Sequence, residues 1–229
     1  PGYTKRWQAN IYNCIPNYSE MGKEATTGFT GIWNLMSGQV VANTTAVGTQ
    51  MLTGFNSSNA SFHRWATLYK YIRQGFIFLD NAKDYMGSEQ DVSYISKKDM
   101  DRLKAETKFL IAYSYFSLFE LYGPVPLITE IEDPENKTID YPRASVDEID
   151  RLLQEVLDSN ALPETLFTES ASGSLDYEHN NDRYNLKEIV RPTKVTVLAL
   201  RAKLWVYAAS PLFNGGYGEA LQLTNKDGK

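Results

Sequence analysis

The side chains best suited to bind a ligand lie in a long polar segment between positions 26 and 61, which is rich in Gly, Ser, Thr and Asn. A sugar offers an apolar ring face and a rim of hydroxyl groups, so aromatic rings flanked by amide side chains provide matching contacts. The segment holds both kinds of residue, and the candidates are Trp33, Asn43, Gln50, Phe55 and Asn56. We therefore expect this segment to bind a carbohydrate.

Trp33 and Phe55 are the two rings that could stack on a sugar. Trp33 also fits a second interpretation, in which it is a core residue that pins the loop. This second interpretation is favoured because Trp side chains are highly buried on average. Phe55 lies between Gly54 and Asn56 and is the more exposed candidate, although its smaller ring is a weaker stacking surface.

The chain offers few groups for catalysis. Its two histidines, His63 and His179, lie in neither an H-E-x-x-H motif nor a Cys/His cluster of the kind that binds zinc. A glycosidase can still hide two carboxylates, because that pair has no fixed spacing in sequence. Glu130, Glu132 and Asp133 are candidates, but a charged surface strand is the favoured interpretation. The sequence therefore predicts no enzyme.

One acidic loop has the composition of a metal site. Asp176, Glu178 and Asp182 place oxygen ligands in a turn-rich segment, and calcium prefers several oxygen ligands of this kind. The spacing differs from that of an EF-hand, and a solvated acidic loop is the favoured interpretation. We predict no cofactor, with calcium as the alternative.

Charge and composition exclude nucleic acid as a partner. The 229 residues carry a formal net charge of -5, and Lys and Arg form no run that would neutralise a phosphate backbone. The densest basic pair, Lys97-Lys98, is interpreted as the solvated start of a helix. The only cysteine, Cys14, cannot form an intramolecular disulfide and is interpreted as a buried small apolar residue.

The elements that must position these groups have the pattern of helices. Apolar residues recur every three or four positions, which predicts helices near 3–15, 62–85, 96–122, 145–157 and 193–209. Ser96 with Asp99 and Ser145 with Glu148 are capping pairs that mark two helix starts. The last helix is expected to pack through one apolar stripe, which consists of Val195, Leu198, Ala202, Trp205 and Ala209. Trp65 and Trp205 are interpreted as packing anchors rather than ligand platforms.

The third helix is apolar on two sides, which predicts that it is clamped between two neighbours. One stripe consists of Ala105, Phe109, Ala112, Phe116 and Phe119, and the other of Ile111, Tyr115, Leu118 and Tyr122. Gly123 is expected to end this helix in the left-handed conformation. Pro124 and Pro126 cannot continue a helix, so the chain is expected to leave in an extended form.

Four segments resemble, in the same order, helices of the SusD/RagB family of Bacteroidetes nutrient-binding lipoproteins. Residues 105–130 (AETKFLIAYSYFSLFELYGPVPLITE) are similar to the family's aromatic-rich helix and its Tyr-Gly-x-x-Pro-Leu-x-Thr turn. Residues 191–216 (RPTKVTVLALRAKLWVYAASPLFNGG) resemble a later helix that ends in Ser-Pro-Leu-Phe-Asn. Residues 65–81 and 143–157 resemble an early helix and a short connecting helix.

The resemblance implies an all-α fold of tetratricopeptide-like antiparallel helix pairs with long irregular loops, one of them from about residue 16 to residue 61. Residues 1–229 would form the N-terminal portion of a SusD-like domain, with the C-terminal part of the family fold absent from this chain. The outer-membrane attachment of such proteins, through a lipid on an N-terminal cysteine, would also be absent.

The resemblance also implies a function. Such a protein binds oligosaccharide or polysaccharide at the cell surface and delivers it to a SusC-like TonB-dependent transporter. A peptide-binding or structural scaffold of the same family is the alternative, and a glycoside hydrolase has the least support. An exposed cluster of two or more aromatic faces around the long loop would favour glycan, whereas a concave groove lined with Asn, Arg and Lys would favour peptide.

Overall fold

The computed structural model describes residues 2–16, 63–84, 94–131, 141–163, 168–169, 175–176, 191–214 and 218. The segment predicted to bind a glycan falls between these ranges. Its five candidate residues therefore lie outside the described residues, namely Trp33, Asn43, Gln50, Phe55 and Asn56.

The described ranges contain the five predicted helices, close to their expected bounds. These are α1 (Gly2–Ile11), α4 (Trp65–Asn81), α5 (Lys97–Tyr122), α6 (Val146–Asp158) and α7 (Lys194–Ala208). A 3-10 turn, η1 (Tyr12–Cys14), continues α1. Two short strands, β1 (Thr168–Glu169) and β2 (Leu175–Asp176), pair antiparallel and have no counterpart in the sequence-based prediction.

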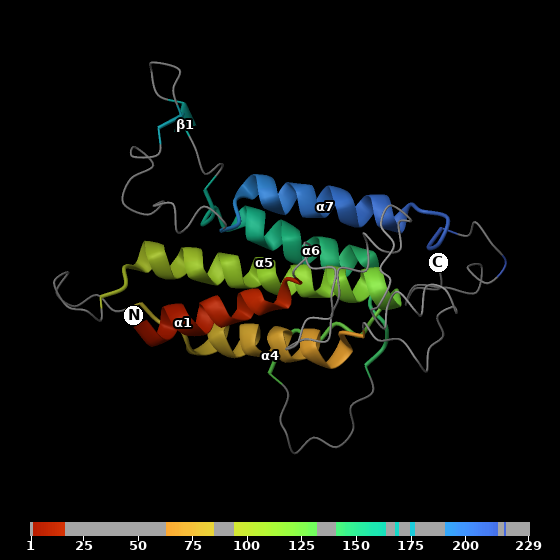
Figure 1. The fold of residues 1–229 in the computed structure, drawn as a ribbon, viewed down its shortest axis with the longest axis horizontal. Helices are drawn as coiled ribbons and strands as arrows, with labels where there is room; N and C mark the ends of the chain where they lie inside the picture. The colour runs from red at the N-terminus through yellow and green to blue at the C-terminus, as the bar shows by residue number, and fades with distance from the viewer. Residues whose placement is uncertain are drawn as a thin grey trace, which may run out of the picture.

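The helices form an antiparallel stack. Figure 1 shows α4, α5, α6 and α7 side by side in chain order, each running opposite to the one before it, with α1 alongside α4 and α5. Successive antiparallel helices joined in this way are the arrangement of tetratricopeptide-like proteins. The predicted all-α fold is confirmed.

Helix α5 is buried on both of its apolar stripes, as predicted. Every residue of the stripe from Ala105 to Phe119 is at most 4% exposed. In the other stripe Tyr115 is fully buried and Tyr122, at the helix end, is half-buried. Helix α4 packs on one side of α5 and α6 packs on the other, so α5 is the centre of the core.

The ends of the helices follow the capping chemistry that the sequence predicts. The Ser96 hydroxyl accepts a hydrogen bond from the Asp99 backbone N–H at 3.0 Å. The Ser145 N–H donates to the Glu148 carboxylate at 3.0 Å. Each cap satisfies N–H groups that have no partner within the helix itself.

Helix α5 ends at Gly123, but in a different conformation from the predicted one. Its φ of 69° is positive as expected, whereas its ψ of -155° lies outside the left-handed helical region. This region of backbone space is essentially restricted to glycine. The expectation of glycine is therefore confirmed and the expected conformation is wrong, because the chain must turn directly into the extended segment that begins at Pro124.

A buried carboxylate joins the two sides of the stack. Glu106 of α5 is fully buried, and its Oε2 accepts hydrogen bonds from Gln8 at 3.1 Å and Tyr12 at 3.0 Å. The Arg191 guanidinium lies 2.7 Å from the same oxygen, and Arg102 Nε lies 3.0 Å from Oε1. An isolated buried charge would be strongly destabilising. The two guanidinium groups offset it and tie α1, α5 and the approach to α7 together.

The apolar stripe predicted to pack α7 is instead its exposed face. Val195 is 55% exposed and Trp205 43%, whereas Leu200 and Leu204 face the core. The periodicity could not choose between the faces because α7 is apolar on both. The choice is fixed by Asp150 of α6, which pairs with Arg201 (Nε to Oδ1, 2.5 Å) and accepts from the Trp205 indole at 3.1 Å.

Helices α4 and α5 come into close contact at Gly75. A Cβ atom on this residue would lie 2.7 Å from Cγ1 and 2.8 Å from Cδ1 of Ile111, well inside van der Waals contact. Glycine therefore allows the two backbones to approach each other at this point.

Replacing Gly75 by alanine tests this contact. Alanine in a helix interior is normally more stabilising than glycine by up to about 1 kcal/mol. Here the added methyl group overlaps buried Ile111, so we expect a loss of about 1–3 kcal/mol in the free energy of unfolding. Urea denaturation measures the difference. An Ile111→Val change removes Cδ1 and should restore part of the loss, and a stabilised Gly75→Ala protein would contradict the packing.

Cys14 is fully buried, as predicted. Its Sγ lies 3.9 Å from the backbone oxygen of Leu110. Burial raises the pKa of the Cys14 thiol from 9.0 to about 11. The folded protein therefore holds the neutral thiol at pH values where an unfolded chain has begun to release the proton.

This pKa predicts a loss of stability at alkaline pH. Between pH 9 and about pH 11 the unfolded state binds fewer protons at Cys14 than the folded state. The free energy of unfolding therefore falls across this window, by at most about 1.4 kcal/mol per pH unit from this group. Denaturant titrations in steps across the window should show a steeper fall for the wild type than for Cys14→Ala. Parallel pH profiles would be evidence against the buried thiol.

Candidate functional site

An aromatic cluster lies where α4 begins and α5 ends. It consists of Trp65 and Tyr69 of α4 and Tyr122 of α5. The centroid of the Trp65 ring system lies 5.1 Å from that of Tyr69 and 5.3 Å from that of Tyr122. Trp65 is 39% exposed, so its neighbours support the ring system while part of it remains open to solvent.

The helix geometry explains why these three rings meet. Trp65 and Tyr69 are four residues apart, which places them on the same face of α4. Tyr122 is the last residue of α5, and because α5 runs antiparallel to α4 its end lies beside the first turn of α4. The rings of Trp65 and Tyr122 meet edge to face at 79°, an arrangement that aromatic quadrupoles favour.

The Tyr122 hydroxyl caps the start of α4. It accepts hydrogen bonds from the backbone N–H groups of Arg64 at 2.7 Å and Trp65 at 3.1 Å. Arg64 occupies the N-cap position but makes no side-chain cap of its own. Because the first N–H groups of a helix need partners, Tyr122 supplies from α5 what the local sequence lacks. The same contact holds Trp65 in place.

Two tyrosines hold the proline turn beside the cluster. The Tyr69 hydroxyl donates to the backbone oxygen of Pro126 at 2.6 Å. The Tyr115 hydroxyl donates to the oxygen of Ile128 at 2.7 Å and accepts from its N–H at 2.8 Å. Burial raises the pKa of Tyr69 to about 12, although the charge of Arg143 acts in the opposite direction. Tyr69 therefore remains a hydrogen-bond donor at neutral pH.

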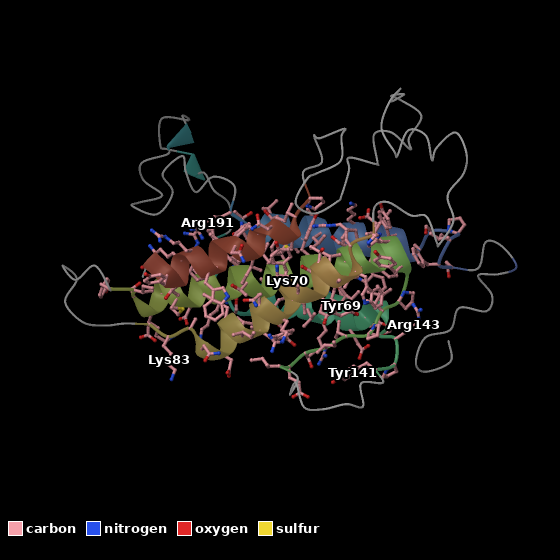
Figure 2. The ribbon with its side chains drawn as sticks, turned by 60° about the horizontal axis from the view of Figure 1, so that its bottom comes forward. Tyr69, Lys70, Lys83, Tyr141, Arg143 and Arg191 are labelled. Atoms are coloured by element: carbon pink, nitrogen blue, oxygen red, sulfur yellow. The ribbon has the colours of Figure 1, made fainter. Side chains whose placement is uncertain are left out.

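Arg143 brings a cation to the same end of the stack. Its NH1 group donates to the backbone oxygen of Pro124, and residues 126 and 143 form an antiparallel bridge. Figure 2 shows Arg143 beyond Tyr69 toward one end of the helices, with Arg191 toward the other end. The Arg143 side chain is exposed, and a guanidinium group carries five N–H donors. Exposed ring faces and such donors are the contacts that a sugar uses.

The cluster adjoins the segment that the sequence predicts to bind a glycan. That segment ends at residue 61, four positions before Trp65 in the chain. The interpretation of Trp65 as a packing anchor is correct in part, because the residue packs on two tyrosines and also keeps an exposed face. A Trp-Tyr pair four residues apart, immediately after a polar segment, is the sequence signal that identifies this site.

Other candidates from the sequence lie elsewhere. Glu130 is exposed at the end of the proline turn, as its interpretation as a surface residue requires. Asp176 is part of β2, while Glu178 and Asp182 lie outside the described residues, so neither the prediction of no cofactor nor its calcium alternative is tested. Within the described ranges no group of three or more His, Cys, Asp or Glu residues could hold a metal ion. Nor does this part of the chain contain a helix long and apolar enough to cross a bilayer.

The chain belongs to a SusD-like family. Residues 9–172 match the model of this family, which is described as starch-binding and associating with the outer membrane. Its members are binding proteins rather than enzymes. No curated relative matches this sequence.

Several solved structures share the fold at low sequence identity. A laminarin-binding SusD-like protein is 18% identical, with a TM-score of 0.59 over 99% of this chain and 45% of that chain. A SusD superfamily protein from Bacteroides thetaiotaomicron VPI-5482 is 20% identical, with a TM-score of 0.57 over 96% and 45%. A SusD-like protein from Bacteroides fragilis NCTC 9343 is 18% identical, with a TM-score of 0.53 over 96% and 36%. This chain thus spans less than half the length of these proteins.

Removing the Tyr122 hydroxyl tests its role as a cap. A Tyr122→Phe change keeps the ring and leaves two N–H groups at the start of α4 without their acceptor. We expect a loss of about 1–2 kcal/mol in the free energy of unfolding, together with faster hydrogen exchange in the first turn of α4. Tyr3→Phe, at a side chain on α1 that is 89% exposed, is the control for loss of a hydroxyl. Unchanged exchange at Trp65 in the Tyr122 variant would contradict the cap.

Proposed function

We propose that this protein captures a glycan at the cell surface through the aromatic cluster and the polar segment that leads into it. The observation that carries the proposal is the exposed face of Trp65, held by Tyr69 and Tyr122 at the point where the predicted ligand-binding segment joins the helical stack. Membership of a family described as starch-binding supports the same ligand class.

The cluster supplies two kinds of contact to a sugar. The exposed part of the Trp65 ring would stack on the apolar face of a pyranose, and Arg143 would donate hydrogen bonds to hydroxyl groups at the rim. Phe55 and Asn56 of the polar segment would add further contacts. The exposed Trp65 ring next to this segment supports a glycan as the ligand, and the protein would bind this ligand without altering it.

Family membership suggests two partners for this protein, a transporter and the outer membrane. A glycan-binding protein that associates with the outer membrane would pass its ligand to a transporter, and we propose a SusC-like TonB-dependent protein in this role. Attachment to the membrane would use a lipid on an N-terminal cysteine. The antiparallel helices would form the rigid back that docks on the transporter.

We further propose that residues 1–229 are the N-terminal portion of a longer SusD-like domain. The solved relatives are more than twice as long as the part that this chain matches. The exposed apolar face of α7 supports this proposal, because a contiguous apolar surface of this kind is typical of a surface that another segment covers. The remaining part of the domain would pack on Val195, Leu198 and Trp205.

Replacing Trp65 by alanine tests the glycan site. Loss of a stacked indole should raise the dissociation constant for a bound glycan at least about tenfold, which corresponds to about 1.4 kcal/mol. Affinity electrophoresis and calorimetry with laminarin, starch and other neutral glycans would measure this change. Trp65→Phe should fall between the wild type and Trp65→Ala.

Trp205→Ala is the matched control for this experiment. Trp205 is 43% exposed, close to the 39% of Trp65, but it lies on α7 and away from the aromatic cluster. Glycan affinity should be unchanged in this variant. Equal losses in the two tryptophan variants, or full binding by a folded Trp65→Ala protein, would contradict the proposed site.

A further inference from the structure

A concave surface lies at the end of α5 opposite the aromatic cluster. It is a groove of about 650 Å³ between the first half of α5 and the turn that follows α6. Lys97, Lys98, Lys104 and Lys108 line its α5 side, and Asn160 lies on the opposite side. Lys97, Lys104 and Lys108 are separated by seven and four residues, which places them on one face of α5, and Lys98 lies beside Lys97 at the edge of that face. We call this surface the lysine groove.

Three of these lysines have no ion-pair partner among the residues that the structure describes. Lys97 pairs with Asp101 at a distance of 2.5 Å from Nζ to Oδ2. Lys98, Lys104 and Lys108 form no salt bridge with any residue in the described part of the chain. Among its described lining residues, the groove therefore holds four lysines and one aspartate. This excess of positive charge occurs in a chain whose formal net charge is -5.

The clustering of these lysines on α5 is electrostatically unfavourable. Lys104 and Lys108 are four residues apart on one helix, and like charges at this spacing destabilise a helix by about 0.2–0.5 kcal/mol. The start of α5 adds the positive end of a helix dipole near Lys97 and Lys98. A ligand with several negative charges would relieve this repulsion.

We propose that the lysine groove binds the acidic groups of an anionic polysaccharide, such as the carboxylates of a polyuronate. The row from Lys97 to Lys108 extends over 11 residue steps of α5, or about 16 Å, which is longer than one monosaccharide. It can therefore meet acidic groups on successive sugar units. This inference rests on the proposed glycan-binding function and extends it to a charged class of ligand.

A concave groove with Lys and Asn in its lining meets the criterion that the sequence suggested for a peptide, but the remaining lining of this groove favours a polysaccharide. Its apolar lining residues in the described ranges are Ala105 and Ala161, which form no pocket for a large side chain. The rest of the lining adds short polar groups, Ser159 and Asn160, which match sugar hydroxyls. Peptide grooves instead rely on pockets for alternate side chains or on a free strand edge.

The test compares two pairs of lysines. The groove variant is Lys104→Gln with Lys108→Gln, and the control variant is Lys70→Gln with Lys83→Gln on and just after α4, where both side chains are exposed. Each protein is titrated with polygalacturonate, laminarin and poly-L-glutamate at low and high salt. The groove variant should fold normally, because the change removes a repulsion.

The wild type should bind polygalacturonate with an affinity that falls as salt rises. The groove variant should lose at least about tenfold in this affinity, or about 1.4 kcal/mol, while the control pair stays within about twofold of the wild type. Equal binding by the groove and control variants would overturn the proposal. Tighter binding of poly-L-glutamate than of polygalacturonate would also overturn it, in favour of an acidic peptide.

Titration with laminarin, a neutral glycan, distinguishes failure of the lysine groove from failure of the proposed glycan site at Trp65. Laminarin binding that depends on Trp65 but is unaffected by the lysine changes, together with no binding of polygalacturonate, would overturn the lysine groove alone. Binding of polygalacturonate that depends on Lys104 and Lys108 supports the groove, whether or not laminarin binds.

Discussion

The burial of α5 on two opposite sides is the constraint on which the rest of the structure depends. Its 26 residues extend over about 39 Å and place aromatic and aliphatic side chains against both α4 and α6. Neighbours on both sides fix the order of the stack and require close approach at Gly75. The same constraint explains why the one fully buried carboxylate of α5, Glu106, is matched by two guanidinium groups.

The two candidate binding surfaces lie at the ends of α5, because the side chains in the middle of the helix are buried. At its last residue, Tyr122 meets the start of α4 and holds Trp65 in a position where the indole is supported but still exposed. In its first half, the lysines face a groove that the turn after α6 closes from the other side. Helix α5 thus holds an aromatic surface at one end and a cationic surface at the other. A ligand could contact either surface without rearranging the buried side chains between them.

The sequence predicts the helices well because their information is local. Periodicity and capping pairs such as Ser145 and Glu148 locate α6 without any knowledge of its neighbours. The rotation of α7 could not be predicted, since both of its faces are apolar and the choice is made by the pairing of Arg201 with Asp150. The same limit applies to the sites. Tyr122 caps a helix 57 residues before it in the chain, and Lys104 lines a groove only because the turn after α6 lies opposite.

The central claim is that a sugar stacks on Trp65. The chain has four tryptophans, so a nitrogen-15 NMR spectrum resolves four indole N–H signals, which single replacements can assign. Titration with a bound oligosaccharide should shift the Trp65 signal. The Trp7 signal, whose N–H donates to Gln74, and the Trp205 signal, whose N–H donates to Asp150, should stay in place. Saturation of glycan binding without any shift at Trp65 would contradict the account.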